Sequence, residues 1–302
     1  MITVANAPVS YGVFDLARPD LVPPPTGGEL LDAVGAAGYD GIDLGPRGLL
    51  GTGGDLVEAL AARDLLLCGG WIDLPFAGSD AEFESALALA LPVLEDLALV
   101  ARTQDGPAPR PTLADAGDAL RRAPPGGGPA LEADARMWAA LVKRVERVCA
   151  LARGLGLTPT FHHHAATYVE TPAEIDRLLN DTSVDLTFDS GHLLLAGGDA
   201  LADFDRWRAR INHIHLKDVD TAVLPRVAGR PDALRQVWER RAFTALGDGD
   251  LDVAGLMERI LADGYDGYLV VEQDVVLLDR RDVERAVSDQ VRNRDLLRRW
   301  IP

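Results

Sequence analysis

The chain has 302 residues, of which 30 are Lys or Arg and 47 are Asp or Glu, so its formal net charge is −17. A chain of this length can bury a large core without disulfides, and α/β barrels commonly use about 250 residues or more as one domain. The excess of negative charge argues against a nucleic-acid partner and against an anionic membrane surface.

The composition also indicates where the protein works. The longest apolar stretch, residues 87–100, is interrupted by Pro92 and two acidic residues and cannot span a bilayer. The chain opens on an apolar strand-like segment without a basic leader, and its two cysteines, Cys68 and Cys149, lie far apart in sequence. We therefore expect a cytoplasmic protein with reduced thiols.

Short apolar runs alternate along the chain with longer segments of helical periodicity. In chain order the sequence predicts a strand at 2–6, helix 29–37, strand 41–44, helix 53–63, strand 65–71, helix 80–95, strand 97–101, a Pro- and Gly-rich excursion at about 103–132, helix 134–153, strand 157–162, helix 172–180, strand 184–189, helix 201–210, strand 211–216, an irregular insertion at about 219–249, helix 253–262, strand 267–272 and helix 281–300. Pro92 is expected to end or kink the third helix.

Eight strand–helix units in alternation predict a parallel sheet with helical crossovers. Eight strands close into a TIM barrel, so we predict a single-domain (β/α)8 barrel of the α/β class over residues 1–302. A doubly wound open sheet is the alternative.

All six histidines of the chain lie between positions 162 and 215. They follow or end the predicted fifth, sixth and seventh strands, together with Asp189 and Lys217, and the eighth strand ends in Glu272, Gln273 and Asp274. The histidines are His162, His163, His164, His192, His213 and His215. Because active sites of such barrels gather at the carboxyl ends of the strands, we expect one polar rim there.

The alternation of side chains along a strand divides this set. His162 and His164 share one face and His163 points the other way, while His213, His215 and Lys217 share a face. A mixed set of imidazoles and carboxylates suits a catalytic divalent cation better than a structural thiolate zinc site.

Other interpretations of the same residues are weaker but stay open. A single His at a strand end is usually structural, Asp189 could cap a helix, and Lys217 could be a surface residue. Lys217 is one of only two lysines, and a compact ammonium there could bind an oxyanion or transfer a proton. The glycines lack the spacing of a nucleotide-binding loop, and no G-x-S-x-G nucleophile motif occurs.

Several segments resemble one known family, the xylose-isomerase-like TIM-barrel superfamily of the sugar-phosphate isomerase/epimerase type. The similarity is strongest to its branch that dehydrates keto-inositols (inososes), and it covers nearly the whole chain except about residues 103–132. The segments are NAPVSYG at 6–12, HHHAATYVET at 162–171, FDSGH at 188–192, HIHLKDVD at 213–220, FTALGDGDLD at 243–252 and GYDGYLVVEQD at 264–274.

The resemblance implies one divalent metal ion held by Glu, Asp, His and Glu from the last four strands. Asp189, His215 and Glu272 match three of these ligands. The fifth-strand position departs from the family, because His162 stands where relatives have Glu; His164 and Glu170 are the alternatives. A His ligand makes the site less anionic and favours Mn²⁺ or Co²⁺, with Mg²⁺ or Zn²⁺ as further candidates.

The resemblance further implies a metal-dependent lyase that dehydrates a keto-inositol or related keto-cyclitol through a metal-stabilised enediolate. Glu170, His164 and Lys217 are the candidate bases, and His192 matches a substrate-contacting His with a role in proton transfer. The expected substrate-binding residues are Asn6, Trp71, His192, Lys217 and Gln273.

Three alternatives accompany this expectation. A sugar or sugar-phosphate isomerase/epimerase would share the first proton abstraction. A phosphodiester-cleaving enzyme related to endonuclease IV would need a basic DNA-facing rim, and a non-catalytic sugar-binding barrel would need no base. The expected partner is a small polyol or keto-sugar, and relatives of this kind are often homo-oligomers.

Overall fold

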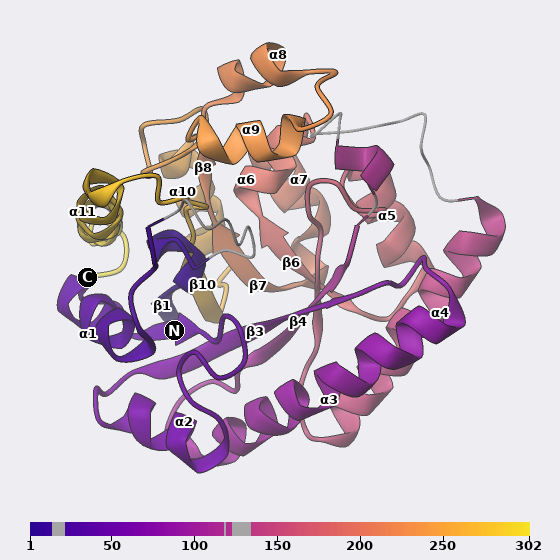
Figure 1. Cartoon of the computed structure of the whole chain (residues 1–302), viewed down its shortest axis with the longest axis horizontal. Coiled ribbons are helices and arrows are strands. Elements are labelled where there is room, and N and C mark those ends of the chain that lie inside the picture. The colour runs from indigo at the N-terminus through magenta and orange to yellow at the C-terminus, as the bar shows by residue number, and fades with distance from the viewer. Residues whose placement is uncertain (14–21, 118, 123–133) are drawn as a thin grey trace.

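The computed structural model describes residues 1–13, 22–117, 119–122 and 134–302 and contains a closed eight-stranded parallel barrel. The predicted fold is confirmed (Figure 1). The barrel order is β1-β10-β7-β6-β5-β4-β3-β2, with β1 (Ile2–Asn6), β2 (Gly41–Asp43), β3 (Leu66–Leu74), β4 (Arg110–Asp115), β5 (Thr160–His162), β6 (Asp185–Asp189), β7 (Ile211–Leu216) and β10 (Gly267–Val271).

Helices surround the barrel, and the first and last of them, α1 and α11, pack side by side where the ring closes (Figure 1). Capping boxes at Thr26, Ser79, Thr171 and Asp279 start four of the helices. The helices are α1 (Gly27–Ala37), α2 (Gly53–Ala61), α3 (Asp80–Thr103), α4 (Ala135–Gly154), α5 (Pro172–Asp181), α6 (Ser190–Leu195), α7 (Ala200–Trp207), α10 (Val253–Ala262) and α11 (Arg280–Leu297). None of the helices in the described part of the chain is long and apolar enough to cross a membrane.

The predicted fourth strand at 97–101 is wrong. Helix α3 continues through Pro92 to Thr103, because Leu87, Leu94 and Leu97 recur at helical spacing and bury one continuous face. The true fourth strand, β4, lies inside the predicted excursion and pairs with β3 from Gly69↔Arg110 to Leu74↔Asp115. Prolines on and around β4 hid its strand pattern.

The structure describes a part of the remaining predicted excursion. Ala119–Arg122 forms one turn of 3-10 helix, whereas residues 118 and 123–132 lie outside the described residues.

The predicted irregular insertion at 219–249 contains regular structure. Strands β8 (Asp218–Val219) and β9 (Phe243–Thr244) pair antiparallel, and α8 (Leu224–Val227) and α9 (Ala233–Glu239) pack together at the top of Figure 1. Val227, Val237 and Phe243 bury their side chains in a small apolar cluster of this segment. The insertion is therefore a packed subdomain on the barrel, with elements too short to show a period in the sequence.

Candidate active site

Four buried side chains meet at the carboxyl ends of neighbouring strands. His162 ends β5, Asp189 ends β6, His215 lies near the end of β7, and Glu272 follows β10. The register places Asp189 beside His215, and because parallel strands all end at one rim, side chains distant in sequence converge.

The donor atoms of these four residues lie within 4.8 Å of one another. His162 Nε2 is 3.1 Å from His215 Nδ1 and 3.3 Å from Asp189 Oδ2, and His215 Nδ1 is 3.2 Å from Glu272 Oε2. Asp189 Oδ2 is buried and has no hydrogen-bond partner among the residues that the structure describes, although Lys217 Nζ lies 3.2 Å away. Two imidazole nitrogens and two carboxylates facing one point are the donor set of a divalent transition-metal ion, so these residues fit such an ion.

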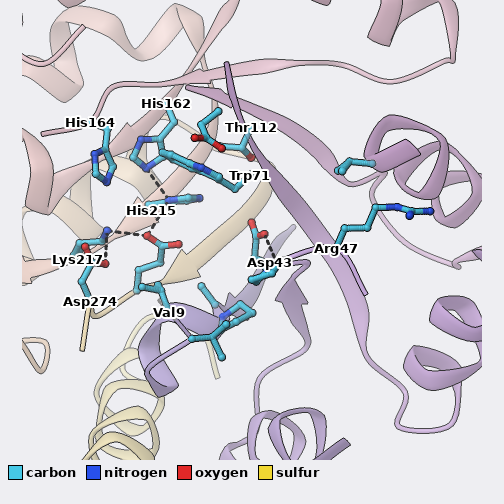
Figure 2. A pocket seen from close by; sticks show the side chains of 18 residues that line it. Val9, Asp43, Arg47, Trp71, Thr112, His162, His164, His215, Lys217 and Asp274 are labelled. Atoms are coloured by element: carbon cyan, nitrogen blue, oxygen red, sulfur yellow. Dashed lines mark hydrogen bonds and ion pairs between the residues drawn. The ribbon is translucent and has the colours of Figure 1, made fainter. Parts of the chain in front are cut away.

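Lys217 supplies a permanent positive charge beside this group (Figure 2). Its Nζ lies 2.9 Å from Glu272 Oε2, 2.9 Å from Asp274 Oδ1 and 3.2 Å from His192 Nε2. Burial alone would lower the pKa of Lys217, but the carboxylates, Asp189 foremost, outweigh it and hold that pKa well above its usual value. Lys217 therefore stays cationic.

The histidine pKa values follow from burial and neighbouring charge. Burial lowers the pKa of His162 to about 4 and that of His163 to about 3, which keeps both rings neutral. Burial would also lower the pKa of His215, but Glu272 and Asp189 outweigh it and raise that pKa. Burial opposes ionisation of Asp189 as well, yet Lys217 holds its pKa well below the usual value. The site thus combines the neutral His162 ring and the ionised Asp189 with His215, whose affinity for a positive charge is raised by the two carboxylates.

The three candidates for the fifth-strand ligand are separated in space. His162 belongs to the four-residue group, whereas His164 forms a second group with His192 and Asp274. Glu170 is buried in an ion pair with Arg121, at 3.1 Å, and accepts a hydrogen bond from the Ala166 N–H at 3.1 Å. The geometry thus favours His162 as the ligand. The second group is less suited to a metal ion, because the Lys217 ammonium already supplies a positive charge beside His192 and Asp274.

Asn6 and Gln273, both expected to bind substrate, instead make hydrogen bonds to other side chains of the protein. The Asn6 side chain donates to Gln290 Oε1 on α11 at 3.0 Å, and Gln290 in turn donates to Gln273 Oε1 at 3.1 Å. Gln273 also donates to Asp289 Oδ2 at 3.2 Å. These contacts tie β1 and β10 to α11. Trp71, by contrast, is 36% exposed and faces the site.

A cavity of about 620 Å³ opens over the four-residue group. Figure 2 shows His162, His164 and Trp71 along one wall, with Asp43 and Val9 opposite. We call it the proximal cavity. Its mixed apolar and polar lining and its volume are typical of a small-molecule site.

The alternation predicted along β5 is confirmed by the contacts of His163. Its Nε2 accepts the hydrogen bond of the Asp189 N–H at 3.2 Å, on the side away from the cavity. His213 is buried with Asp43 and His215 as neighbours, and its two ring nitrogens lack a hydrogen-bond partner among the described residues. His163 therefore helps to position β6, and His213 lies beneath the rim.

Sequence reasoning missed three acidic residues near the site. Asp43 ends β2, Asp73 lies on β3, and Asp115 ends β4. Asp43 and Asp73 line the proximal cavity. The strand-end rule applied to Asp43 would have found it, whereas Asp115 was hidden by the misplaced fourth strand.

Asp115 is expected to make stability depend on pH. Burial raises its pKa from 3.8 to about 6, so the folded state binds this proton more tightly than the unfolded state does. The stabilisation is present at low pH and is lost as pH rises through about 6. Relative to Asp115→Asn, the native chain should gain about 2 kcal/mol in free energy of unfolding between pH 7 and pH 4.5, measured by urea denaturation. An equal pH dependence of both chains would contradict this.

Gly191 on α6 confines the aliphatic part of Lys217. A Cβ at this position would lie 2.7 Å from Lys217 Cγ and 2.9 Å from its Cβ. Since Lys217 is buried among its ion pairs, Gly191→Ala is expected to lower the free energy of unfolding by about 1–3 kcal/mol, as measured in urea. Gly35→Ala is the control, because a Cβ there meets nothing within 4 Å and a helical Ala should stabilise by about 0.5–1 kcal/mol. Equal effects of the two changes would contradict the prediction.

Residues 113–292 match the family model of the xylose isomerase-like TIM barrel, which covers more than half of the chain. The protein belongs to the xylose isomerase-like TIM-barrel family, as the resemblance implied.

Individual relatives refine this placement. The chain is 39% identical over 140 residues to an inosose dehydratase of Lacticaseibacillus casei, covering 45% of this chain and 47% of that protein. It is 34% identical over 258 residues to the rhizopine catabolism protein MocC of Rhizobium meliloti, covering 82% and 74%. The chain thus matches about half the length of the curated inosose dehydratases.

A solved structure supports the fold independently. The IOLI protein with a bound zinc atom superposes with a TM-score of 0.72 at 11% identity, covering 99% of both chains. At that identity the similarity shows the fold alone.

Proposed function

We propose that this protein is a divalent-metal-dependent lyase that dehydrates a keto-inositol or a closely related keto-cyclitol. The observation that carries the proposal is the buried group of two imidazoles and two carboxylates beneath a polyol-sized cavity. The identity to inosose dehydratases over 140 residues supports the choice of substrate. The expected partner is therefore a small polyol.

His162, Asp189, His215 and Glu272 would hold one divalent ion. Such an ion supplies Lewis-acid polarisation of a ketone and its adjacent hydroxyl. The two nitrogen donors favour Mn²⁺ or Co²⁺ over Mg²⁺, and Zn²⁺ is compatible with the same donors.

His164 is the base that this geometry favours. Its Nδ1 is hydrogen-bonded to the Ala165 carbonyl at 2.9 Å, so Nδ1 carries the proton and Nε2 has a free lone pair. Burial lowers the pKa of His164, which keeps the ring neutral at pH 7. Its ring borders the proximal cavity, with the Trp71 ring 5.3 Å away and the His192 ring 3.8 Å away.

Lys217 and His192 would complete the chemistry. The Lys217 ammonium, fixed by three carboxylates, stabilises negative charge that develops on the ketone oxygen when the α-proton leaves. His192 accepts a hydrogen bond from Lys217 and orients it. The proton taken by His164 can return to the hydroxyl that departs from the neighbouring carbon, so that water leaves and no external acid is needed.

The test is turnover of inosose by purified protein with Mn²⁺ or Co²⁺, followed by ultraviolet absorbance of the conjugated diketone product. We expect the absorbance to rise only when the metal ion is present, and the rise to stop when a chelator is added. His164→Gln should lower kcat by about 100-fold or more, because a general base contributes about that much. Interconversion of ketoses without conversion of inosose would instead assign the isomerase/epimerase alternative.

A further inference from the structure

A second cavity of about 530 Å³ adjoins the proximal one. Both cavities are lined by Trp71, Asp73 and His164, so these three side chains form the boundary between them. We call the second one the distal cavity. Each has the volume of a complete small-molecule site, about 300–1,000 Å³, so the two together exceed what one polyol ring needs.

One wall of the distal cavity is held in a strained backbone conformation. Ala166 has a positive φ of 66°, which is costly for a residue with a side chain. Its N–H donates to Glu170, and Glu170 is paired with the buried Arg121. At Gly117, with φ 81°, a Cβ would lie 2.6 Å from the Ala166 carbonyl oxygen, so the two loops touch.

A buried carboxylate lies in the same wall. Asp115 is 3% exposed, and its Oδ2 accepts hydrogen bonds from the N–H groups of Gly117 and Tyr168, at 3.2 and 3.3 Å. The Glu170–Arg121 pair and Asp115 thus fix the shape of this wall before any ligand arrives. Backbone strain maintained in this way is typical of ligand-binding loops.

The opposite wall comes from the insertion and is connected to the proposed catalytic residues. Asp232, Arg235 and Trp238 of this segment line the distal cavity. The Trp238 indole N–H donates to Asp274 Oδ2 at 3.1 Å, and Asp274 Oδ1 lies 2.9 Å from Lys217 Nζ. A ligand contacting this wall would therefore lie next to the proximal site.

The lining of the distal cavity indicates the chemistry of its ligand. The carboxylate of Asp73 can accept hydrogen bonds from a ligand and the guanidinium group of Arg122 can donate them, while Asp232 and Arg235 pair with each other at 2.7 Å and add one charge of each sign to the lining. Because the lining carries charges of both signs, it does not favour a ligand with a large net charge. The partly exposed face of Trp71 offers an apolar surface to the C–H face of a ring. A neutral unit with many hydroxyl groups satisfies all of these contacts.

We propose that the substrate is a keto-cyclitol or keto-sugar ring that carries a second polyhydroxylated unit, with the reacting ring in the proximal cavity and the attached unit in the distal cavity. This inference rests on the proposed function for the reacting ring and names a larger substrate than a free inosose.

Calorimetric binding to the Mn²⁺-loaded protein tests it without requiring turnover. The probes are free myo-inositol and an inositol that carries one galactosyl unit. We expect the galactosyl compound to bind at least about tenfold more tightly, because it contacts both cavities. In Ala116→Trp, which places an indole in the distal cavity, the ratio of the two affinities should fall toward one.

Two further variants keep the comparison interpretable. Leu89→Trp is the control, since Leu89 is 80% exposed on α3 and borders neither cavity, and it should retain the ratio. Asp232→Trp obstructs the distal cavity from the insertion and replaces Ala116→Trp if that chain does not fold.

Equal affinities in the native chain, or a ratio that survives the obstructing change in a folded chain, would overturn the inference. If inosose is turned over but the ratio is one, only this inference fails. If the ratio is as expected but no diketone forms from inosose or from the galactosyl ketone, the proposed dehydration fails instead.

Discussion

Asp189→Asn is expected to lose the divalent metal ion and, with it, turnover of inosose. Asp189 Oδ2 points into the four-residue group. This group holds two carboxylates, Asp189 and Glu272, and the substitution removes one of the two negative charges. Removing a residue that only supports a metal ligand typically lowers metal affinity or activity by about 10–100-fold. Loss of a ligand itself should therefore lower kcat by more than about 100-fold. The measurement is metal content per chain after dialysis, together with initial rates at saturating Mn²⁺.

Asp189→Asn separates loss of the metal ion from unfolding, because the new side chain keeps the shape and one acceptor of the native one. Asp189 Oδ1 caps α6 by accepting from the His192 N–H at 2.8 Å, and the Asn amide oxygen can keep this bond. Lys217 retains Glu272 and Asp274 as counterions. Asp205→Asn, on the exposed face of α7, serves as the control and should leave metal content intact. A metal content in Asp189→Asn equal to that of the control would show that the ion is held elsewhere.

Arg121→Ala is expected to lower the free energy of unfolding by about 3–5 kcal/mol. The Arg121 guanidinium is fully buried and pairs with Glu170 at 3.1 Å and with Glu174 at 2.7 Å. Breaking a buried ion pair from one side leaves carboxylates without their countercharge in a dry environment. Urea denaturation at pH 7 measures the effect.

Arg147→Ala is the matched control for this prediction. Arg147 pairs with Glu84 between α4 and α3, but both side chains are about half exposed, and such pairs contribute about 0–1 kcal/mol. Similar losses for the two changes would contradict the assignment of Arg121 as a buried structural cation.

Glu170→Gln separates the two roles considered for Glu170. As a partner of Arg121 it should be mainly destabilising, because the buried guanidinium loses a countercharge. As a catalytic base it would instead lower kcat by about 100-fold or more in a chain of native stability. We expect the first result, measured by urea denaturation and by initial rates on inosose.

The order of elements was largely predictable, and the errors have a common cause. Seven of the eight predicted strands overlap observed ones, because apolar periodicity reports which face a local segment buries. A short apolar run such as 97–101 fits a strand or a buried helix equally well, and only packing against β3 decides for helix. The Pro-containing β4 is recognisable only from its partner strands.

By itself, the sequence determined the barrel and the rim on which Asp189, His215, Lys217 and Glu272 meet, because strand ends of a parallel barrel converge whatever the surrounding contacts are. Only the tertiary structure decided which side chains at this rim are free to contact a ligand and which are paired with other residues. Arg121 pairs with Glu170 across 49 residues of sequence, and Asn6 bonds to Gln290 across 284, while His162 stays in the four-residue group. Such long-range pairings leave no local period in a sequence, and the same holds for the distal cavity, whose walls come from segments far apart in the sequence.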